Sequence, residues 1–245
     1  MSTDPQPDRV SHKLYLDSAA VESRMSYLVR NLDAEIEENS LLKHSFYKMW
    51  SDGKLTREHL AGYSREYFQL VRAVPELVES IGVFVKDAPT KTVVSGIMEE
   101  EAEHVELWAK FAAALGVSKK ELMAYNGTPK TRAAISRLRS VTEESLCQGA
   151  AAMYAIESEQ PKISKTKLDG LKAFYGMRGD EDGTVYFREH EVADVRHAAV
   201  WRGVLQRDAS SGDERAALEA AALSLSVQNT ILDSVMETYV TPTLA

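Results

Sequence analysis

The chain has 245 residues, of which 44% are hydrophobic and 27% are charged, and its formal net charge is −8. This length fits one large domain or two small ones, and the composition is that of an ordinary soluble globular protein. The acidic balance argues against a nucleic-acid-binding protein, which would carry a basic patch, and against binding to an anionic membrane surface.

Apolar residues recur at three-to-four-residue spacing along most of the chain, while glycine and proline are sparse, with 13 and 7 residues. This pattern predicts an all-α bundle of about seven or eight helices. We expect one compact domain over residues 18–239, a disordered N-terminal tail over 1–17 and a C-terminal tail over 240–245. The expected helical segments are, in chain order, 18–42, 44–50, 56–86, 90–115, 118–124, 128–159, 162–175, 184–207 and 213–239.

Capping residues and helix breakers mark several of these boundaries. We expect Thr56 to cap the helix that follows it, and Pro75 to kink that helix. Gly116 is expected to stop the next long helix, and Pro129 to occupy the first position of the helix over 128–159.

The single cysteine, Cys147, excludes a disulfide within the chain and favours a reducing compartment. It has no basic or histidine neighbour in sequence, so we expect a buried, inert thiol. Residues 1–9 are polar and contain no apolar signal core, and no apolar run approaches the roughly 18 residues that a membrane span needs. We therefore expect a soluble cytoplasmic protein that binds neither membranes nor nucleic acid.

One group of candidate metal ligands falls on the helix expected over 184–207. His190, Asp194 and His197 stand at positions i, i+4 and i+7, so they lie on one stripe of an α-helix. Two imidazoles and a carboxylate on one stripe make half of a metal site. The alternative is a solvated charged face, because the segment is rich in charge.

Two further groups lie on other expected helices. Glu100 and His104 are four residues apart and Glu101 and His104 are three apart, so either glutamate can share a metal with the histidine. Four glutamates within residues 99–103 equally fit an acidic solvated face. Glu157 follows a strongly apolar stretch, and its carboxylate is either paired or metal-bound in the interior or exposed at a helix end.

Together these groups supply two glutamates, one aspartate and three histidines from three helices. This mixed nitrogen and oxygen set can hold two metal ions with open positions, and it suits iron or manganese better than zinc–thiolate chemistry. The surplus acidic neighbours Glu101 and Glu189 either orient the ligands or are exposed.

Aromatic residues gather on segments that are expected to face inward. They include Phe46, Tyr47, Trp50, Tyr63, Tyr67, Tyr154 and Tyr186. Core packing explains most of them, although tyrosines beside a dimetal site can also be oxidised or carry electrons. Periodicity does not separate these interpretations.

Several stretches carry a resemblance to a known family. They are HSFYKMWS (44–51), HVELW (104–108), ALGV (114–117), YAIES (154–158) and, most specific, EHEVADVRHA (189–198). Over about residues 31–206 the chain resembles the heme-oxygenase-like (TenA/PqqC-type) all-helical proteins. More narrowly, it resembles the CADD-like para-aminobenzoate synthases of folate metabolism.

The resemblance implies an enzyme that activates O2 at two metal ions, iron with iron or iron with manganese, with an external reductant. The metal ligands that it implies are Glu100, His104, Glu157, His190, Asp194 and His197. The alignment favours Glu100, whereas Glu101 gives the spacing found in ferritin-type sites, so this choice stays open.

CADD-like members are understood to build para-aminobenzoate from one of their own tyrosines, with a lysine supplying the amino nitrogen, and to be spent after one turnover. The matching residues here are Tyr47 and Lys167. Tyr63 and Tyr186 match tyrosines near the site that are candidates for radical transfer, whereas Ile156 stands where a relative has a tyrosine. The resemblance also implies a homodimer, and the electron donor is unknown.

Two other hypotheses remain. The same dimetal site can oxidise an external small molecule instead of Tyr47. Alternatively, the protein is a non-enzymatic helical interaction protein whose charged clusters are solvated faces.

Overall fold

A computed structural model describes residues 27–178, 182–210 and 212–241. The expected tail over 1–17 and the start of the first expected helix lie outside these residues. The elements are a helical stretch over 27–38, then η1 Leu41–Lys43, α2 Ser45–Ser51, α3 Arg57–Val71, α4 Val74–Gly82, α5 Ala88–Ala114, α6 Lys119–Ala124, α7 Pro129–Thr142, α8 Leu146–Glu157, α9 Gln160–Phe174, η2 Asp182–Thr184, α10 Val185–Asp208, α11 Glu214–Val235 and the π-helical turn η3 Met236–Val240. Since the described residues contain no strand, the all-α prediction is confirmed.

The helix expected over 56–86 is divided into α3 and α4, so the prediction of one kinked helix is wrong. Thr56 does cap α3, because its side chain accepts a hydrogen bond from the backbone N–H of His59. Pro75 lies in the first turn of α4. There its missing N–H costs no helical hydrogen bond, whereas inside a continuous helix its ring would clash with the preceding turn.

The helix expected over 128–159 is also divided, into α7 and α8. Ser145 caps α8, since its Oγ accepts a hydrogen bond from the backbone N–H of Gln148. The first expected helix ends at residue 38, and Ser40 caps the short 3₁₀ turn η1 that follows.

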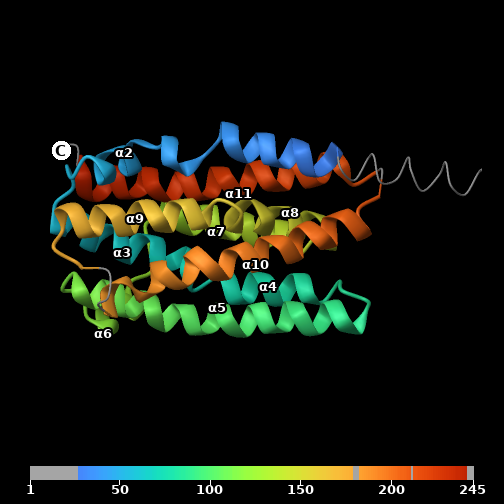
Figure 1. Ribbon diagram of the computed structural model, residues 1–245, viewed down its shortest axis with the longest axis horizontal. Helices are drawn as coiled ribbons and strands as arrows, with labels where there is room; N and C mark the ends of the chain where they lie inside the picture. The colour runs from blue at the N-terminus through green and yellow to red at the C-terminus, as the bar shows by residue number, and fades with distance from the viewer. Residues whose placement is uncertain (1–26, 179–181, 211, 242–245) are drawn as a thin grey trace, which may run out of the picture.

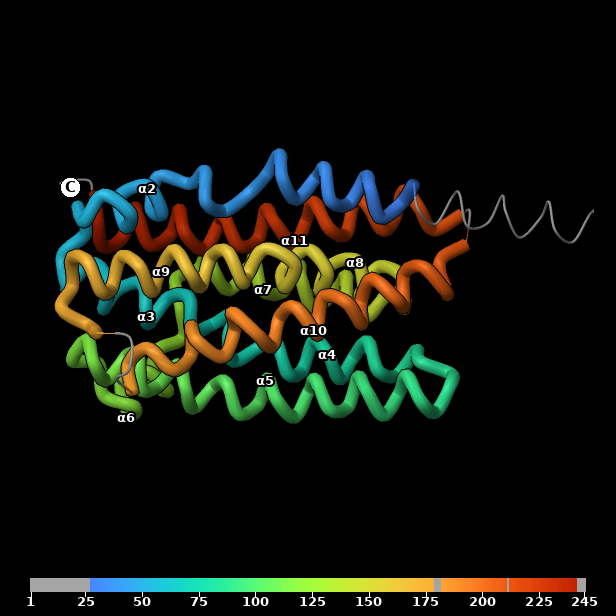
Figure 2. Tube along the Cα trace, in the orientation of Figure 1, coloured from blue at the N-terminus to red at the C-terminus, as the bar shows by residue number. Residues whose placement is uncertain are grey.

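The long helices run side by side along one axis of the molecule (Figures 1 and 2). α10 packs against α5 on one side and against α8 and α9 on the other, while α11 packs against α7 and α8. α10 therefore lies where three long helices meet, and its inward stripe faces both α5 and α8.

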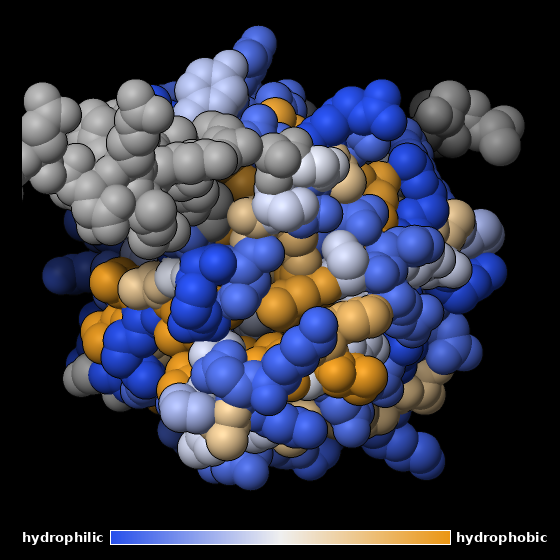
Figure 3. Space-filling model, turned by 90° about the vertical axis from the view of Figure 1, so that its right-hand side faces the viewer, coloured by the Kyte–Doolittle hydropathy of each residue, from blue (hydrophilic) through white to orange (hydrophobic). Residues whose placement is uncertain are grey.

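The core is rich in aromatic side chains, and Trp50, Trp108 and Trp201 are all fully buried. Cys147 is buried as expected, and burial raises the pKa of its thiol to about 12. The end of the bundle in Figure 3 presents mostly hydrophilic residues with apolar ones between them. Among the described residues, every helix is too short or too polar to cross a bilayer.

Candidate metal centre

The three groups of candidate ligands meet inside the bundle. α10 contributes His190, Asp194 and His197, whose exposed fractions are 3%, 1% and 1%. Glu157 at the end of α8 and His104 on α5 are also buried. The hypothesis that these groups form solvated faces is therefore wrong for these five residues.

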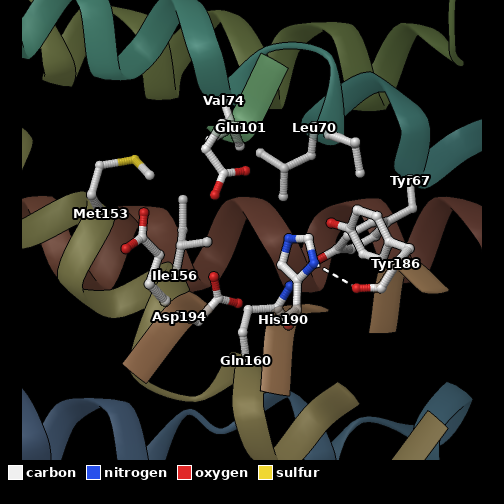
Figure 4. A pocket seen from close by; sticks show the side chains of 12 residues that line it. Tyr67, Leu70, Val74, Glu101, Met153, Ile156, Gln160, Tyr186, His190 and Asp194 are labelled. Atoms are coloured by element: carbon white, nitrogen blue, oxygen red, sulfur yellow. Dashed lines mark hydrogen bonds between the residues drawn. The ribbon is translucent and has the colours of Figure 1, made fainter. Parts of the chain in front are cut away.

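Two sets of ligand atoms are close enough to hold metal ions. In one, Glu101, His104 and His190 offer atoms that all lie within 4.8 Å of one another, and in the other Glu101, Asp194 and His197 do the same. Glu101 belongs to both sets, so its carboxylate would contribute a ligand atom to each of two metal ions held there. Figure 4 shows Glu101, His190 and Asp194 pointing toward one another from α5 and α10.

The structure therefore brings Glu101, and not the preferred Glu100, into the cluster. Glu101 is 6% exposed, with Oε2 at 3.3 Å from His104 Nδ1 and Oε1 at 3.2 Å from His197 Nδ1. The Glu100 side chain is 41% exposed and accepts hydrogen bonds from Arg196. The difference depends on which side of α5 is buried: Glu101 lies on that side with His104 and Trp108, while Glu100 lies at its rim.

Hydrogen bonds outside the cluster orient two of the imidazoles. His190 Nδ1 donates to the backbone carbonyl of Tyr186 at 2.7 Å, which leaves Nε2 free to bind a metal. His197 Nε2 lies 3.0 Å from Glu100 Oε2 and donates to it, which leaves Nδ1 facing Glu101. Such outer contacts set the tautomer and the direction of a metal-binding histidine, so Glu100 has a supporting place at the site.

Several buried polar atoms of the cluster lack the partners that would offset the cost of their burial. His104 Nδ1, His197 Nδ1, Glu157 Oε1 and both carboxylate oxygens of Asp194 are buried without a hydrogen-bond partner. Burial, and then neighbouring carboxylates, raise the pKa values of Glu157 and Asp194 well above their usual range. Unpaired buried carboxylates are costly, and divalent cations are the groups that would compensate them.

The protonation states of Glu101 and His190 also agree with metal binding. Burial acts to raise the pKa of Glu101, but the neighbouring imidazoles of His104 and His197 hold it below its usual value. Burial lowers the pKa of His190 to about 3, so its imidazole is neutral, as a metal ligand must be. The carboxylate and imidazole donors, without a thiolate, fit iron or manganese.

A small cavity of about 20 Å³ adjoins the cluster. Its other wall is apolar and comes from α3, α4 and α8 (Figure 4). The apolar residues are Leu70, Val71, Val74, Met153 and Ile156. This volume holds about one water-sized molecule.

Lys167 lies in an aromatic cage next to this site. It is fully buried, its Nζ has no hydrogen-bond partner, and burial lowers its pKa to about 7. Five rings surround Nζ at 5.1–5.9 Å from their centroids, namely those of Tyr47, Tyr63, Tyr67, Trp108 and Phe187. The structure thus brings Tyr47, Tyr63 and Lys167 together, although α9 is far in sequence from α2 and α3.

Tyr186 lies on the metal side of this cage. Its ring stacks on that of His190, with 3.9 Å between the centroids and 26° between the planes. Glu189, by contrast, is exposed and makes no part of the cluster.

Two residues at the site were not predicted from the sequence. Trp201 Nε1 donates to Glu157 Oε2 at 3.0 Å and so orients that carboxylate. Trp201 follows His197 by four residues and continues the stripe on α10, a spacing that was available in the sequence. Tyr67 lines the cavity and donates to Gln228. It was expected only to face inward, and periodicity does not distinguish it from its neighbours.

Comparisons with known proteins agree with this site. A family model described as an iron-containing redox enzyme matches residues 62–229. The chain is 36% identical over 211 residues to a 4-aminobenzoate synthase of Chlamydia muridarum, covering 84% of this chain and 89% of that protein.

Two solved structures show the same fold. One is a domain of unknown function with a heme oxygenase-like fold from Shewanella denitrificans, with a TM-score of 0.74, 18% identity, and coverage of 86% of this chain and 91% of the other. The second is a TenA homolog from Pseudomonas syringae, with a TM-score of 0.73, 15% identity, and coverage of 86% and 92%. Since the family model spans most of the described bundle, the chain is an oxidoreductase and belongs to the family of iron-containing redox enzymes with the heme-oxygenase-like fold.

Proposed function

We propose that the protein makes para-aminobenzoate for folate synthesis, with its own Tyr47 side chain as the carbon source and Lys167 as the amino donor. One observation carries the proposal. The unpaired Lys167 Nζ lies 5.6 Å from the centroid of the Tyr47 ring, inside a cage beside the candidate metal cluster. The name of the Chlamydia relative supports the same product.

The product and the Tyr47 side chain differ at two places on one benzene ring. An amino group replaces the hydroxyl group, and a carboxylate replaces the methylene carbon. A lysine supplies nitrogen only as the neutral amine, and the pKa of about 7 means that Lys167 is partly neutral near physiological pH.

The candidate metal ligands are Glu101, His104, Glu157, His190, Asp194 and His197. Bound iron, alone or with manganese, would supply activation of O2 with electrons from an external reductant. Glu100 and Trp201 hold two of these side chains in place, and the apolar wall limits the cavity to about one water-sized molecule. Manganese, the electron donor, the cytoplasmic location and the homodimer remain predictions.

The size of the cavity favours Tyr47 over an external substrate. A volume of about 20 Å³ beside the ligands accepts a molecule the size of water or O2 but not an aromatic ring. An external aromatic substrate would require the apolar wall to open.

The test is mass spectrometry after aerobic incubation with iron, manganese and a reductant. We expect the Tyr47 peptide to lose its aromatic side chain in proportion to the para-aminobenzoate formed. Protein labelled with 15N-lysine should yield 15N-labelled product. Tyr47→Phe should abolish the product, whereas the control Tyr154→Phe should not, because the Tyr154 hydroxyl donates to Asp33 and its ring belongs neither to the cavity lining nor to the Lys167 cage. An intact Tyr47 peptide in fully metallated, active protein would exclude self-sacrifice, and product formation by Tyr47→Phe would favour an external substrate.

A further inference from the structure

The proposed function requires oxidation to reach Tyr47 from a distance. Tyr47 does not line the cavity at the candidate ligands. At the metal side, Tyr186 stacks on His190. At the other side, Tyr63 lies in the same cage as Tyr47, and both tyrosines are fully buried.

Trp108 joins the two sides. Its ring centroid is 4.8 Å from that of Tyr186 and 5.7 Å from that of Tyr63. Among the ring contacts of residues 27–178, 182–210 and 212–241, Trp108 is the one ring that contacts both tyrosines. It is fully buried, and its Nε1 donates to the backbone carbonyl of Ser64 at 2.8 Å.

We propose that Trp108 is an electron-transfer residue that carries one electron from Tyr63 to Tyr186 and so links the metal pair to Tyr47. The step rests on the proposed function for its end point at Tyr47, but the relay itself has its own readout. The oxidant would be O2, activated at metals that the candidate ligands would hold. Tyr63 loses one electron and its phenolic proton. The electron passes through Trp108 to Tyr186, whose ring stacks on His190, and the oxidant bound there would accept it. The proton passes to the Lys167 amine, whose nitrogen lies 5.4 Å from the Tyr63 ring centroid.

An indole suits this position for two reasons. Among protein side chains, indole and phenol are the readily oxidised rings. The alternative path from Tyr186 to Tyr63 runs through Phe187 and Phe111, whose rings are not readily oxidised. Trp108 also keeps its N–H on the Ser64 carbonyl throughout, so it returns to its starting state without exchanging a proton.

Tyr67 offers a competing route. It lines the cavity, and its ring lies 5.3 Å from that of Tyr63. Within the described part of the chain, the Tyr67 ring contacts those of Tyr63 and Trp108 and not that of a candidate metal-binding histidine, whereas Tyr186 stacks directly on one. The contact with His190 favours the route through Tyr186 and Trp108.

Freeze-quench electron paramagnetic resonance tests the relay in the metal-loaded full-length chain after addition of O2. In wild-type protein we expect a tyrosyl radical that Tyr63→Phe removes. Trp108→Phe should leave metal content and O2 uptake unchanged, while the Tyr63 radical falls at least about tenfold. Trp108→Tyr, which is again oxidisable, should restore the radical and the para-aminobenzoate yield.

Trp50→Phe is the matched control. Trp50 is also a fully buried indole next to Tyr63, at 5.8 Å, and it also donates to a backbone carbonyl, that of Lys167, but it has no contact with Tyr186. We expect it to keep the Tyr63 radical. An equal loss of the radical in Trp50→Phe would indicate a packing effect and overturn the relay. A Tyr63 radical at the wild-type level in Trp108→Phe would also overturn it.

Two further outcomes separate the hypotheses. Loss of the Tyr63 radical in Tyr67→Phe but not in Trp108→Phe would overturn the relay in favour of the Tyr67 route. A radical that depends on Trp108 in protein that leaves Tyr47 intact would support the relay and refute the proposed source of the product.

Discussion

At the residue scale, two adjacent glutamates have different surroundings. Glu101 lies between two imidazoles in the interior, while Glu100 holds His197 from the rim. We expect Glu101→Gln to lose stoichiometric metal, because the amide brings no charge to offset the cations. Glu100→Gln should keep the metal with affinity weakened by about tenfold, the usual cost of losing an outer hydrogen bond to a ligand. Metal analysis of both variants, at matched protein concentration, decides the assignment, and metal retention by Glu101→Gln would refute it.

Lys167 makes stability depend on pH. Burial lowers its pKa from the usual 10.5 to about 7, so between these values the unfolded chain binds more protons than the folded chain. The free energy of unfolding contributed by this group therefore rises with pH across that window. In metal-free protein, the free energy of unfolding of Lys167→Met should exceed that of wild type by on the order of a few kcal/mol at pH 7, and the difference should shrink toward pH 10. Urea unfolding at several pH values measures this, and a pH-independent difference would contradict the lowered pKa.

At the element scale, the contact of α2 with α9 places Tyr47 beside Lys167, and a glycine permits it. A Cβ on Gly170 would lie 2.5 Å from the Trp50 ring. Gly170→Ala should therefore push α2 away, destabilise the fold by about 1–3 kcal/mol and reduce Tyr47 cleavage. The control Gly96→Ala, within α5, meets nothing within 4 Å and should stabilise by about 0.5–1 kcal/mol. Thermal unfolding measures the stability of both variants. Equal stability would mean that the close approach of Gly170 to Trp50 does not contribute to the packing of α2 on α9.

The sequence predicted the elements of this site better than their boundaries. The spacing of His190, Asp194 and His197 predicted one inward stripe because helical periodicity is local. The break at Pro75 was missed because a proline either kinks a continuous helix or begins a new one. The break at Ser145 was missed because a serine occurs both inside a helix and as its N-cap. The surrounding packing decides between these states.

The cage around Lys167 could not be predicted from the spacing of residues, for another reason. Its rings come from α2, α3, α5 and α10, and nothing in their spacing encodes that they meet at one nitrogen. The resemblance paired Tyr47 with Lys167, but the linking position of Trp108 required the packed structure. The choice of Glu101 over Glu100 likewise depends on which side of α5 faces α10.

At the scale of the whole molecule, metal ions would join three helices that otherwise bring like charges together. Glu101, Glu157 and Asp194 lie on α5, α8 and α10, and binding to the folded form alone adds about 2.7 kcal/mol of stability at a hundredfold excess over Kd. For a chain of this size we therefore expect the Tm to rise by roughly 5–10 °C on loading with iron and to fall again with a chelator. His190→Ala and His197→Ala should abolish this rise. His44→Ala removes the histidine that caps α2 away from the cluster, so it should lower the Tm of both forms and keep the rise. Calorimetry of the loaded and metal-free forms measures each shift. An unchanged Tm in wild-type protein that holds stoichiometric metal would mean that the ions do not join these helices.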